Sequence, residues 1–330
     1  MTNCFDRRDF LTLLGSSAAA WPLAARAEGH SPVIGFLNSA SPDPTLQRVA
    51  AFRKGLNEMG FERQNAAIEF RWAENQIYRL PGMAADLVRR NVTIIAATGG
   101  TASAIAAKRA TSTIPIVFGV GVDPVQLGLV ASLARPGGNA TGINFFTQEI
   151  IAKRLGLLHD LVPKAARVAV MTNPANAATT EATLRDMPEA ARALGLQTQV
   201  LNASTSREIE AAFATLHRQP VDALFVAGDG FFTSRRVQFA TLAMRYAIPA
   251  VYSGREYPEV GGLMSYGTEI LDRFRHAGVM IGQILKGAKP ADLPVIQSSK
   301  FEFVINMQTA RALGLEVPNA LQLLADEVIE

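Results

Sequence analysis

The sequence contains few residues of the kinds that carry covalent chemistry, metal binding or a strong electric field. Its 330 residues include one cysteine, Cys4, and four histidines. A single cysteine excludes an internal disulfide and a cysteine metal cluster. No two histidines stand at a spacing typical of metal ligands. The formal net charge is only +3 and the basic residues are scattered, so we expect no nucleic-acid partner.

The overall composition is that of a folded globular protein. Hydrophobic residues make up 48% of the chain and charged residues 18%, which excludes a predominantly disordered chain. A chain of this length and composition can bury the cores of about two domains.

The first residues of the chain have the pattern of an export signal. Arg7 and Arg8 directly precede an uncharged, largely apolar run at 10–25, which resembles a twin-arginine signal. The run is shorter than the ~20 residues that cross a bilayer, so cleavage is favoured over a membrane anchor. The small residues at 25 and 27 fit a signal-peptidase site. We therefore expect residues 1–27 to be a signal peptide and the mature chain to begin near Glu28.

Cys4 precedes the arginine pair, whereas a lipid-attachment cysteine would follow the apolar run. We therefore expect a periplasmic protein that has neither a lipid anchor nor a thiol after maturation. Beyond the signal, the sequence contains no further apolar stretch of membrane-spanning length.

Short apolar runs then alternate with helical patterns, and this alternation occurs twice. Each run is bounded by Gly, Pro or polar residues, as in parallel strands covered on both faces. Two such arrays predict an α/β fold of two doubly wound, mostly parallel-sheet lobes. The expected strands are 33–37, 67–72, 92–97 and 114–120 in the first array, and 167–172, 198–201, 223–227 and 250–252 in the second.

Two further strands, at 141–145 and 263–266, follow glycine-rich segments and are where we expect the chain to cross between the lobes. A helix at 273–285 is assigned to the first lobe and the terminal segment to the second, which gives a hinge of three crossings. The helix expected at 181–194 contains Pro188, which should kink or restart it. The first lobe is then 31–145 plus about 266–292, and the second is 146–265 plus about 293–330.

A glycine-rich turn follows the third expected strand and opens a helix. Its residues, Gly99, Gly100 and Thr101, bring backbone N–H groups and a hydroxyl to a positive helix terminus, which suits a carboxylate or phosphate. The turn lacks the lysine of a P-loop and the glycine spacing of a dinucleotide-binding motif. The alternative is a purely structural turn with Thr101 as the N-cap.

Polar residues also follow the other expected strands. Ligands of open α/β sheets bind beyond the carboxyl ends of the strands, so these residues are candidates for ligand binding. Each could instead serve only as a cap or turn residue, but their joint location at one edge of both lobes favours a site. They are Ser39, Ser41 and Asp123 in the first lobe, and Asn173, Asp229, Tyr252, Gly254 and Arg255 in the second.

These candidates suit a ligand with charges of both signs. Asp229 and Asp123 can meet an ammonium group, and the Gly100 turn can meet a carboxylate. Asp123 precedes Pro124 and is more readily explained as a helix-entry residue. No nucleophile, base and orienting group occur in a recognisable set, so we expect a binding protein rather than an enzyme.

The order of several motifs resembles one family, the ABC-transporter substrate-binding proteins that include tryptophan- and tyrosine-binding lipoproteins, of the type I periplasmic-binding fold. The resemblance extends from about residue 32 to 330. It is carried by the segments at 114–118, 123–125, 127–130, 135–139, 141–142, 262–267 and 300–306.

The resemblance implies the periplasmic component of an ABC importer, whose two lobes close over a small organic ligand and deliver it to a membrane permease. It implies no cofactor, and we expect a monomer. The segment Tyr252, Ser253, Gly254 and Arg255 differs from the one expected in binders of aromatic amino acids. We therefore favour an amino-acid-like ligand and assign no particular amino acid. The alternatives are a sensor module that presents its closed form to a membrane receptor and a periplasmic α/β enzyme.

Overall fold

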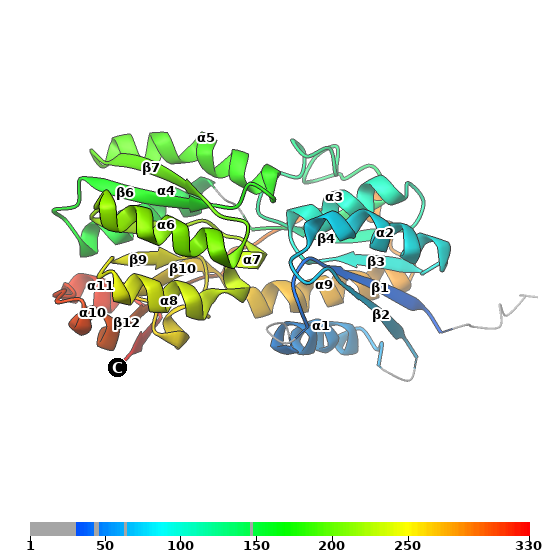
Figure 1. Cartoon of the computed structure of the whole chain (residues 1–330). Coiled ribbons are helices and arrows are strands. Elements are labelled where there is room, and N and C mark those ends of the chain that lie inside the picture. The colour runs from blue at the N-terminus through cyan, green and yellow to red at the C-terminus, as the bar shows by residue number, and fades with distance from the viewer. Residues whose placement is uncertain (1–30, 43–45, 63–64, 146–147) are drawn as a thin grey trace, which may run out of the picture. The chain divides into compact units, whose positions relative to one another are not determined.

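The computed structural model describes residues 31–42, 46–62, 65–145 and 148–330 (Figure 1). The expected signal peptide and Cys4 lie outside the described residues. From Pro32 to Glu330 the chain forms one compact unit. It contains two sheets, each covered by helices on both faces, as the sequence predicts.

The first lobe contains a six-stranded sheet in the order β11-β5-β4-β3-β1-β2, and all of its pairings are parallel. One face packs on α1 and α9, the other on α2 and α3. The strands are β1 (Val33–Asn38), β2 (Ala67–Trp72), β3 (Ile94–Ala97), β4 (Ile116–Val120), β5 (Ala140–Asn144) and β11 (Ile296–Gln297), and the helices are α1 (Leu46–Glu58), α2 (Leu80–Arg89), α3 (Thr101–Ala110) and α9 (Ile270–Leu285).

The second lobe contains a seven-stranded sheet in the order β13-β12-β10-β9-β8-β6-β7, in which only β10 and β12 pair antiparallel. The strands are β6 (Arg167–Thr172), β7 (Gln197–Asn202), β8 (Ala223–Val226), β9 (Ala250–Tyr252), β10 (Met264–Thr268), β12 (Phe301–Asn306) and β13 (Glu327–Ile329). The helices are α4 (Gln148–Leu161), α5 (Ala177–Ala193), α6 (Ser206–Arg218), α7 (Gly230–Ser234), α8 (Arg236–Arg245), α10 (Met307–Ala312) and α11 (Asn319–Leu324).

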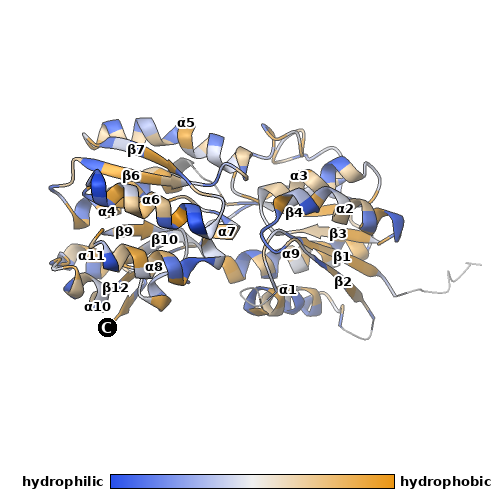
Figure 2. Ribbon diagram, viewed as in Figure 1, coloured by the Kyte–Doolittle hydropathy of each residue, from blue (hydrophilic) through white to orange (hydrophobic). Residues whose placement is uncertain are grey.

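Short 3-10 turns occur at Ile77–Arg79, Pro258–Val260 and Pro290–Asp292. The strands are largely hydrophobic and the outward faces of the helices largely hydrophilic, because each sheet is buried between two helical layers (Figure 2). None of the helices in the described part of the chain combines the length and hydropathy that a membrane crossing requires.

The chain crosses between the sheets three times: from β5 to α4, from β10 to α9, and from β11 to β12. At the second and third crossings, the boundaries differ from the sequence-based expectation. β10 extends to Thr268 rather than residue 266, and Ile296–Gln297 pairs with β5, so the last crossing lies after residue 297 rather than near 293. The short β11 segment carried too little apolar pattern to be recognised as a strand of the first sheet.

Helices α1 and α9 pack unusually closely, and this fixes the position of α9 under the first sheet (Figure 1). A Cβ atom at Gly55 would lie 1.9 Å from the backbone oxygen of Arg275, and one at Gly278 would lie 2.2 Å from that of Phe52. Only glycine allows the two backbones to approach to this distance. The first turn of α9, which directly follows the second crossing, is thereby held at the edge of the lobe.

Candidate functional site

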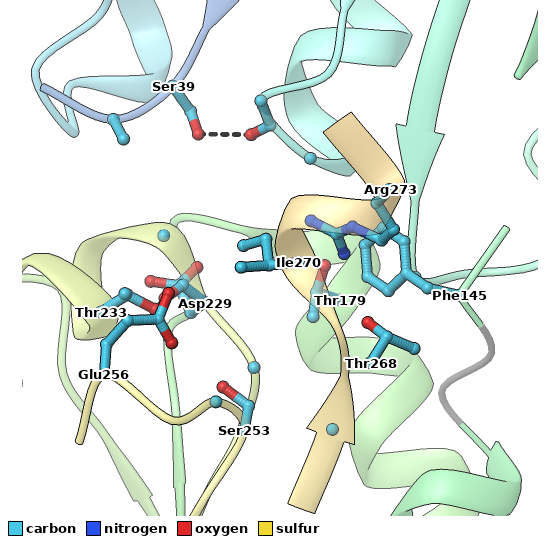
Figure 3. A pocket seen from close by; sticks show the side chains of 18 of the residues that line it. Ser39, Phe145, Thr179, Asp229, Thr233, Ser253, Glu256, Thr268, Ile270 and Arg273 are labelled. Carbon is cyan, nitrogen blue, oxygen red and sulfur yellow. Dashed lines mark hydrogen bonds between the residues drawn. The ribbon is translucent and has the colours of Figure 1, made fainter. Parts of the chain in front are cut away.

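A cavity of about 530 Å³ lies where the carboxyl ends of both sheets meet, and both lobes contribute to its lining (Figure 3). This is the position expected for ligand binding in open α/β sheets. The polar lining from the first lobe and its crossings includes Asn38, Ser39, Gln47, Arg48, Asn75, Thr98, Thr101, Thr268, Glu269 and Arg273. The second lobe contributes Arg154, Asn176, Thr179, Thr183, Asp229, Thr233, Ser253, Arg255, Glu256, Glu259 and Glu302.

The glycine-rich turn lines the cavity at the start of α3. Gly100 has φ +98 and is the N-cap, so Thr101 is the first residue of the helix, and the alternative of Thr101 as the N-cap is wrong. A Cβ atom at Gly99 would lie 2.5 Å from the Cα of Asn38. The Ser39 hydroxyl donates to the Gly99 carbonyl oxygen at 2.6 Å (Figure 3). Both glycines are therefore required by the backbone, and the first N–H groups of α3 have no side-chain cap.

Two buried hydroxyls beside this turn have no hydrogen-bond partner among the described residues. They belong to Thr98, which also lines the cavity, and to Ser103. A buried hydroxyl without a partner is costly, so a polar ligand atom near Thr98 would be stabilised.

Asp229 lies on the opposite side of the cavity, at the N-terminus of α7, and is only 8% exposed. Its Oδ1 accepts from the backbone N–H groups of Phe231 at 2.9 Å and Phe232 at 3.2 Å. The side-chain amides of Asn173 and Asn176 donate to Oδ1 at 3.0 Å and to Oδ2 at 2.9 Å. Neutral donors thus hold the carboxylate in place, and its negative charge forms no ion pair with a described residue.

Arg154 and Arg273 line the cavity, and the sequence-based prediction included neither. The Arg154 Nε–H donates to the Tyr266 carbonyl at 2.8 Å, and its guanidinium lies over the Phe225 ring at 5.2 Å. Burial lowers the pKa of Arg154 to about 10. The Arg273 guanidinium lies 3.8 Å from the Phe145 ring centroid (Figure 3). Both arginines follow closely after a crossing, and that position in the sequence was the signal that could have indicated them.

Other charged residues that line the cavity are already paired. Arg48 of α1 forms an ion pair with Glu256, which follows β9. Arg255 binds Glu259 at 2.8 Å and also contacts Glu302 and Glu327. The bond to Glu259 is the largest cause of its raised pKa. The predicted candidate Arg255 therefore lines the cavity with its charge largely satisfied by carboxylates.

The cavity brings together seven of the predicted residues, namely Ser39, Gly99, Gly100, Thr101, Asp229, Gly254 and Arg255. Ser41, Asp123, Asn173 and Tyr252 are not part of its lining. Asp123 accepts from the Val125 N–H at 2.8 Å and so stabilises its own turn. Tyr252 is fully buried and stacks on Tyr257 with a centroid distance of 4.3 Å, and this burial raises the pKa of its hydroxyl. Its side chain faces the core because strand residues alternate between faces.

Known proteins resemble the chain over most of its length. A tyrosine-binding protein of Clostridioides difficile is 29% identical over 275 residues, which span 83% of this chain and 78% of that protein. The structure of a Streptococcus pneumonia ABC domain in complex with L-Trp has a TM-score of 0.84 and 26% identity, covering 91% of this chain and all of the other. The ligand-free, open structure of a substrate-binding protein with adhesive properties from Clostridium difficile has a TM-score of 0.65 and 27% identity, covering 91% of this chain and 99% of the other.

The resemblance of the fold extends to more distant proteins. A glucose-galactose binding protein from Geobacillus stearothermophilus shares the fold, with a TM-score of 0.59 at 14% identity over 83% of this chain and 96% of the other. The model of the family described as ABC transporter substrate binding protein matches residues 33–329, and the chain belongs to this family.

Proposed function

We propose that this protein captures a small amino-acid-like solute in the cavity between its lobes and delivers it to the membrane permease of an ABC importer. The main support for this proposal is that one cavity is lined by the carboxyl ends of the strands of both sheets. An uncapped helix start lies on one side and the buried carboxylate of Asp229 on the other. A zwitterion matches this arrangement, because its carboxylate suits backbone N–H groups and its ammonium suits Asp229.

The volume and the aromatic lining support an amino acid with a sizeable side chain. The cavity of about 530 Å³ lies within the range typical of small-molecule sites. Phe145, Phe225 and Phe231 contribute aromatic surface. The relatives that bind tyrosine and L-Trp support the same choice.

We propose that the ligand is held by closure of the lobes. The chain superposes better on the L-Trp complex, with a TM-score of 0.84, than on the open, ligand-free relative, with 0.65, although the identities are similar. Polar contacts between described residues of the two lobes include the Arg48–Glu256 ion pair and a hydrogen bond of 3.2 Å from Asn75 to Ser234. A ligand that contacts both lobes would favour such a closed arrangement by its higher affinity for it.

The proposed contacts follow from the geometry. Ser39 and the Gly99, Gly100 and Thr101 turn bind the ligand anion, Asp229 binds its ammonium group, and Gly254 and Arg255 lie at the periphery. Asn173 acts indirectly by holding Asp229 through its amide. Ser41, Asp123 and Tyr252 have structural roles in this proposal.

We propose export to the periplasm by the twin-arginine route, with removal of residues 1–27. Replacement of both Arg7 and Arg8 by lysine should retain the uncleaved chain in the cytoplasm. N-terminal sequencing of the exported protein should begin near Glu28, and a mature chain that keeps Arg7 and Arg8 would contradict the assignment.

Native mass spectrometry of the mature protein, followed by thermal-shift measurements with the twenty L-amino acids, tests the binding function. A co-purifying small molecule, or a raised unfolding temperature with one amino-acid class, is expected because ligands stabilise the state they bind. Asp229→Asn should abolish that rise, whereas the exposed Glu181→Gln should retain it. A wild-type protein that no solute stabilises would remove the basis for the proposal.

A further inference from the structure

Arg273 differs from the other arginines of the cavity because its charge has no partner. Within the described residues its guanidinium forms neither a hydrogen bond nor an ion pair, and its contact is the ring of Phe145 at 3.8 Å. Arg154 has the Tyr266 carbonyl, and Arg48 and Arg255 have carboxylates. Arg273 lies in the first turn of α9, where a positive charge is unfavourable to the helix dipole. Helix stability therefore does not explain this arginine.

Among the described residues, no carboxylate around the cavity forms an ion pair with Arg273. Glu256 attracts it electrostatically but is paired with Arg48, and the Arg48 charge repels Arg273. Glu259 and Glu302 are paired with Arg255, and Glu269 is paired with Lys300 at 4.0 Å. Asp229 is held by amides and backbone N–H groups across the cavity. These acidic groups are thus either occupied or on the opposite side.

The surroundings of Arg273 make its charge costly in the ligand-free protein. Burial, followed by the repulsion from Arg48, lowers the pKa of the guanidinium to about 9. At neutral pH the group is charged but has lost part of its hydration. An anion from outside the protein would restore the missing stabilisation.

The contact with Phe145 also orients the guanidinium. A guanidinium stacked on an aromatic ring keeps its N–H groups available at its edge. Figure 3 shows Arg273 beside Phe145, and Thr179 and Thr268 also line the cavity. A planar carboxylate can accept two parallel hydrogen bonds from such an edge, whereas a sugar hydroxyl cannot supply the charge.

We propose that Arg273 binds a carboxylate group of the ligand and thereby restricts the protein to organic acids, including amino acids. This inference rests on the proposed function, because it takes the cavity as the ligand site. It identifies a specificity-determining residue in addition to the Gly99 turn, and an amino acid with a single carboxylate would place that group between the turn and Arg273. It also excludes neutral sugars and simple amines, although sugar binders share the fold.

The test is a binding screen by thermal shift and calorimetry on the mature protein. The probes are the twenty L-amino acids, small mono- and dicarboxylic acids, the matched carboxamides of these compounds, and neutral sugars. Stabilisation is expected only from probes with a carboxylate. In Arg273→Gln the dissociation constant of such a probe should rise roughly 10- to 100-fold, the range for loss of hydrogen bonds between charged groups.

Two matched variants sharpen the result. Arg273→Lys keeps the charge without the planar edge and should give an intermediate loss of affinity. Arg89→Gln removes a surface arginine, 68% exposed, and should change affinity less than twofold. In the ligand-free state Arg273→Gln should unfold at the same or a higher temperature, because it removes a desolvated charge. A purely structural arginine would instead lower the unfolding temperature.

The outcomes separate this inference from the proposed function. Tight binding of a carboxamide or sugar that depends on Asp229 would overturn the role of Arg273 and leave the binding function intact. A carboxylate probe whose affinity is within twofold of wild type in Arg273→Gln would do the same. Absence of binding by any probe would overturn both.

Discussion

Arg48 and Glu256 form an ion pair between the two lobes, and both side chains line the cavity. Their side chains are 13% and 21% exposed, so the pair is screened less than one on the surface. The contact exists only while the lobes are together. In the proposed closure of the lobes, it therefore stabilises the closed form whether or not a ligand is present.

Glu256→Gln is expected to shift the ligand-free protein toward open forms. Loss of about 1 kcal/mol from a partly buried ion pair changes the closed-to-open ratio roughly fivefold. Small-angle X-ray scattering should show a larger radius of gyration for the variant, and ligand affinity should fall by a similar factor. Glu181→Gln removes an exposed acidic residue of α5 and serves as the control. A radius of gyration unchanged by Glu256→Gln would show that other contacts hold the lobes together.

Asp229 has two roles that different substitutions should separate. Asn at this position can still accept from the Phe231 and Phe232 N–H groups, although its NH2 group would replace the oxygen that accepts from the Asn176 amide. Asp229→Asn should therefore cost less stability than Asp229→Ala but lose tenfold or more in affinity for an ammonium-bearing ligand. Asp229→Ala also removes the N-cap of α7 and should lower the free energy of unfolding by about 0.5–2 kcal/mol. Chemical denaturation and calorimetry measure the two effects. Equal ligand affinity for Asp229→Asn and wild type would exclude a role for the charge.

The sequence predicted the strands well because buried parallel strands are nearly continuous apolar runs. The expected ranges 67–72 and 167–172 match β2 and β6 residue for residue. Of the two effects expected of Pro188, a restart of the helix is wrong, because α5 continues from Ala177 to Ala193, and a kink stays a prediction. Pro188 is exposed, so water can satisfy the carbonyl that loses its backbone donor.

The site was predictable only in part. The turn at Gly99 and the carboxylate of Asp229 follow directly from the ends of two strands, where sequence spacing is informative. Arg154 and Arg273 were missed because they lie within amphipathic helices, where an arginine usually faces solvent. Their position in the cavity depends on how the lobes meet after each crossing, and no local pattern encodes that relationship.

Protonation of the Asp222 carboxyl should lower the stability of the protein at acidic pH. Its Oδ2 accepts from the backbone N–H groups of Ala166 at 2.9 Å and Arg167 at 2.8 Å, and the bond from Arg167 is the largest cause of its lowered pKa. A carboxyl whose pKa is lowered on folding stabilises the protein at pH values above its ordinary pKa of 3.8. This stabilisation disappears as the pH falls through the lowered pKa.

Asp222→Asn should therefore lower the free energy of unfolding at pH 7 by about 0.5–1 kcal/mol, less than the ~1.5–3 kcal/mol typical of bonds to a charged group, because the side chain is exposed. The difference from wild type should shrink between pH 4 and pH 2, where the wild-type carboxyl becomes neutral. Urea denaturation over this pH range measures it. Asp160→Asn, at an exposed aspartate of α4, is the control. A difference that stays constant down to pH 2 would exclude the carboxylate charge as its cause.

The close packing of α1 on α9 should make Gly278 intolerant of even a methyl group. A Cβ atom there would lie 2.2 Å from the Phe52 backbone oxygen, and backbone cannot move aside as a flexible side chain can. Gly278→Ala should lower the free energy of unfolding by about 1–3 kcal/mol, as overpacking of a core does. Gly82 of α2 provides the matched control, because a Cβ atom there has no neighbour within 4 Å. Gly82→Ala should be neutral or stabilise the protein by up to about 1 kcal/mol, since alanine favours the helix.

Thermal and urea unfolding of both glycine variants would test this packing, and ligand affinity would test its link to the site. The first turn of α9 carries Arg273, so a displaced α9 should also weaken ligand binding in Gly278→Ala. If Gly278→Ala lowers stability without changing affinity, α9 can shift along α1 while Arg273 keeps its place in the cavity. If the two glycine variants are equally stable, the helices must separate readily, and the close approach of their backbones does not fix α9.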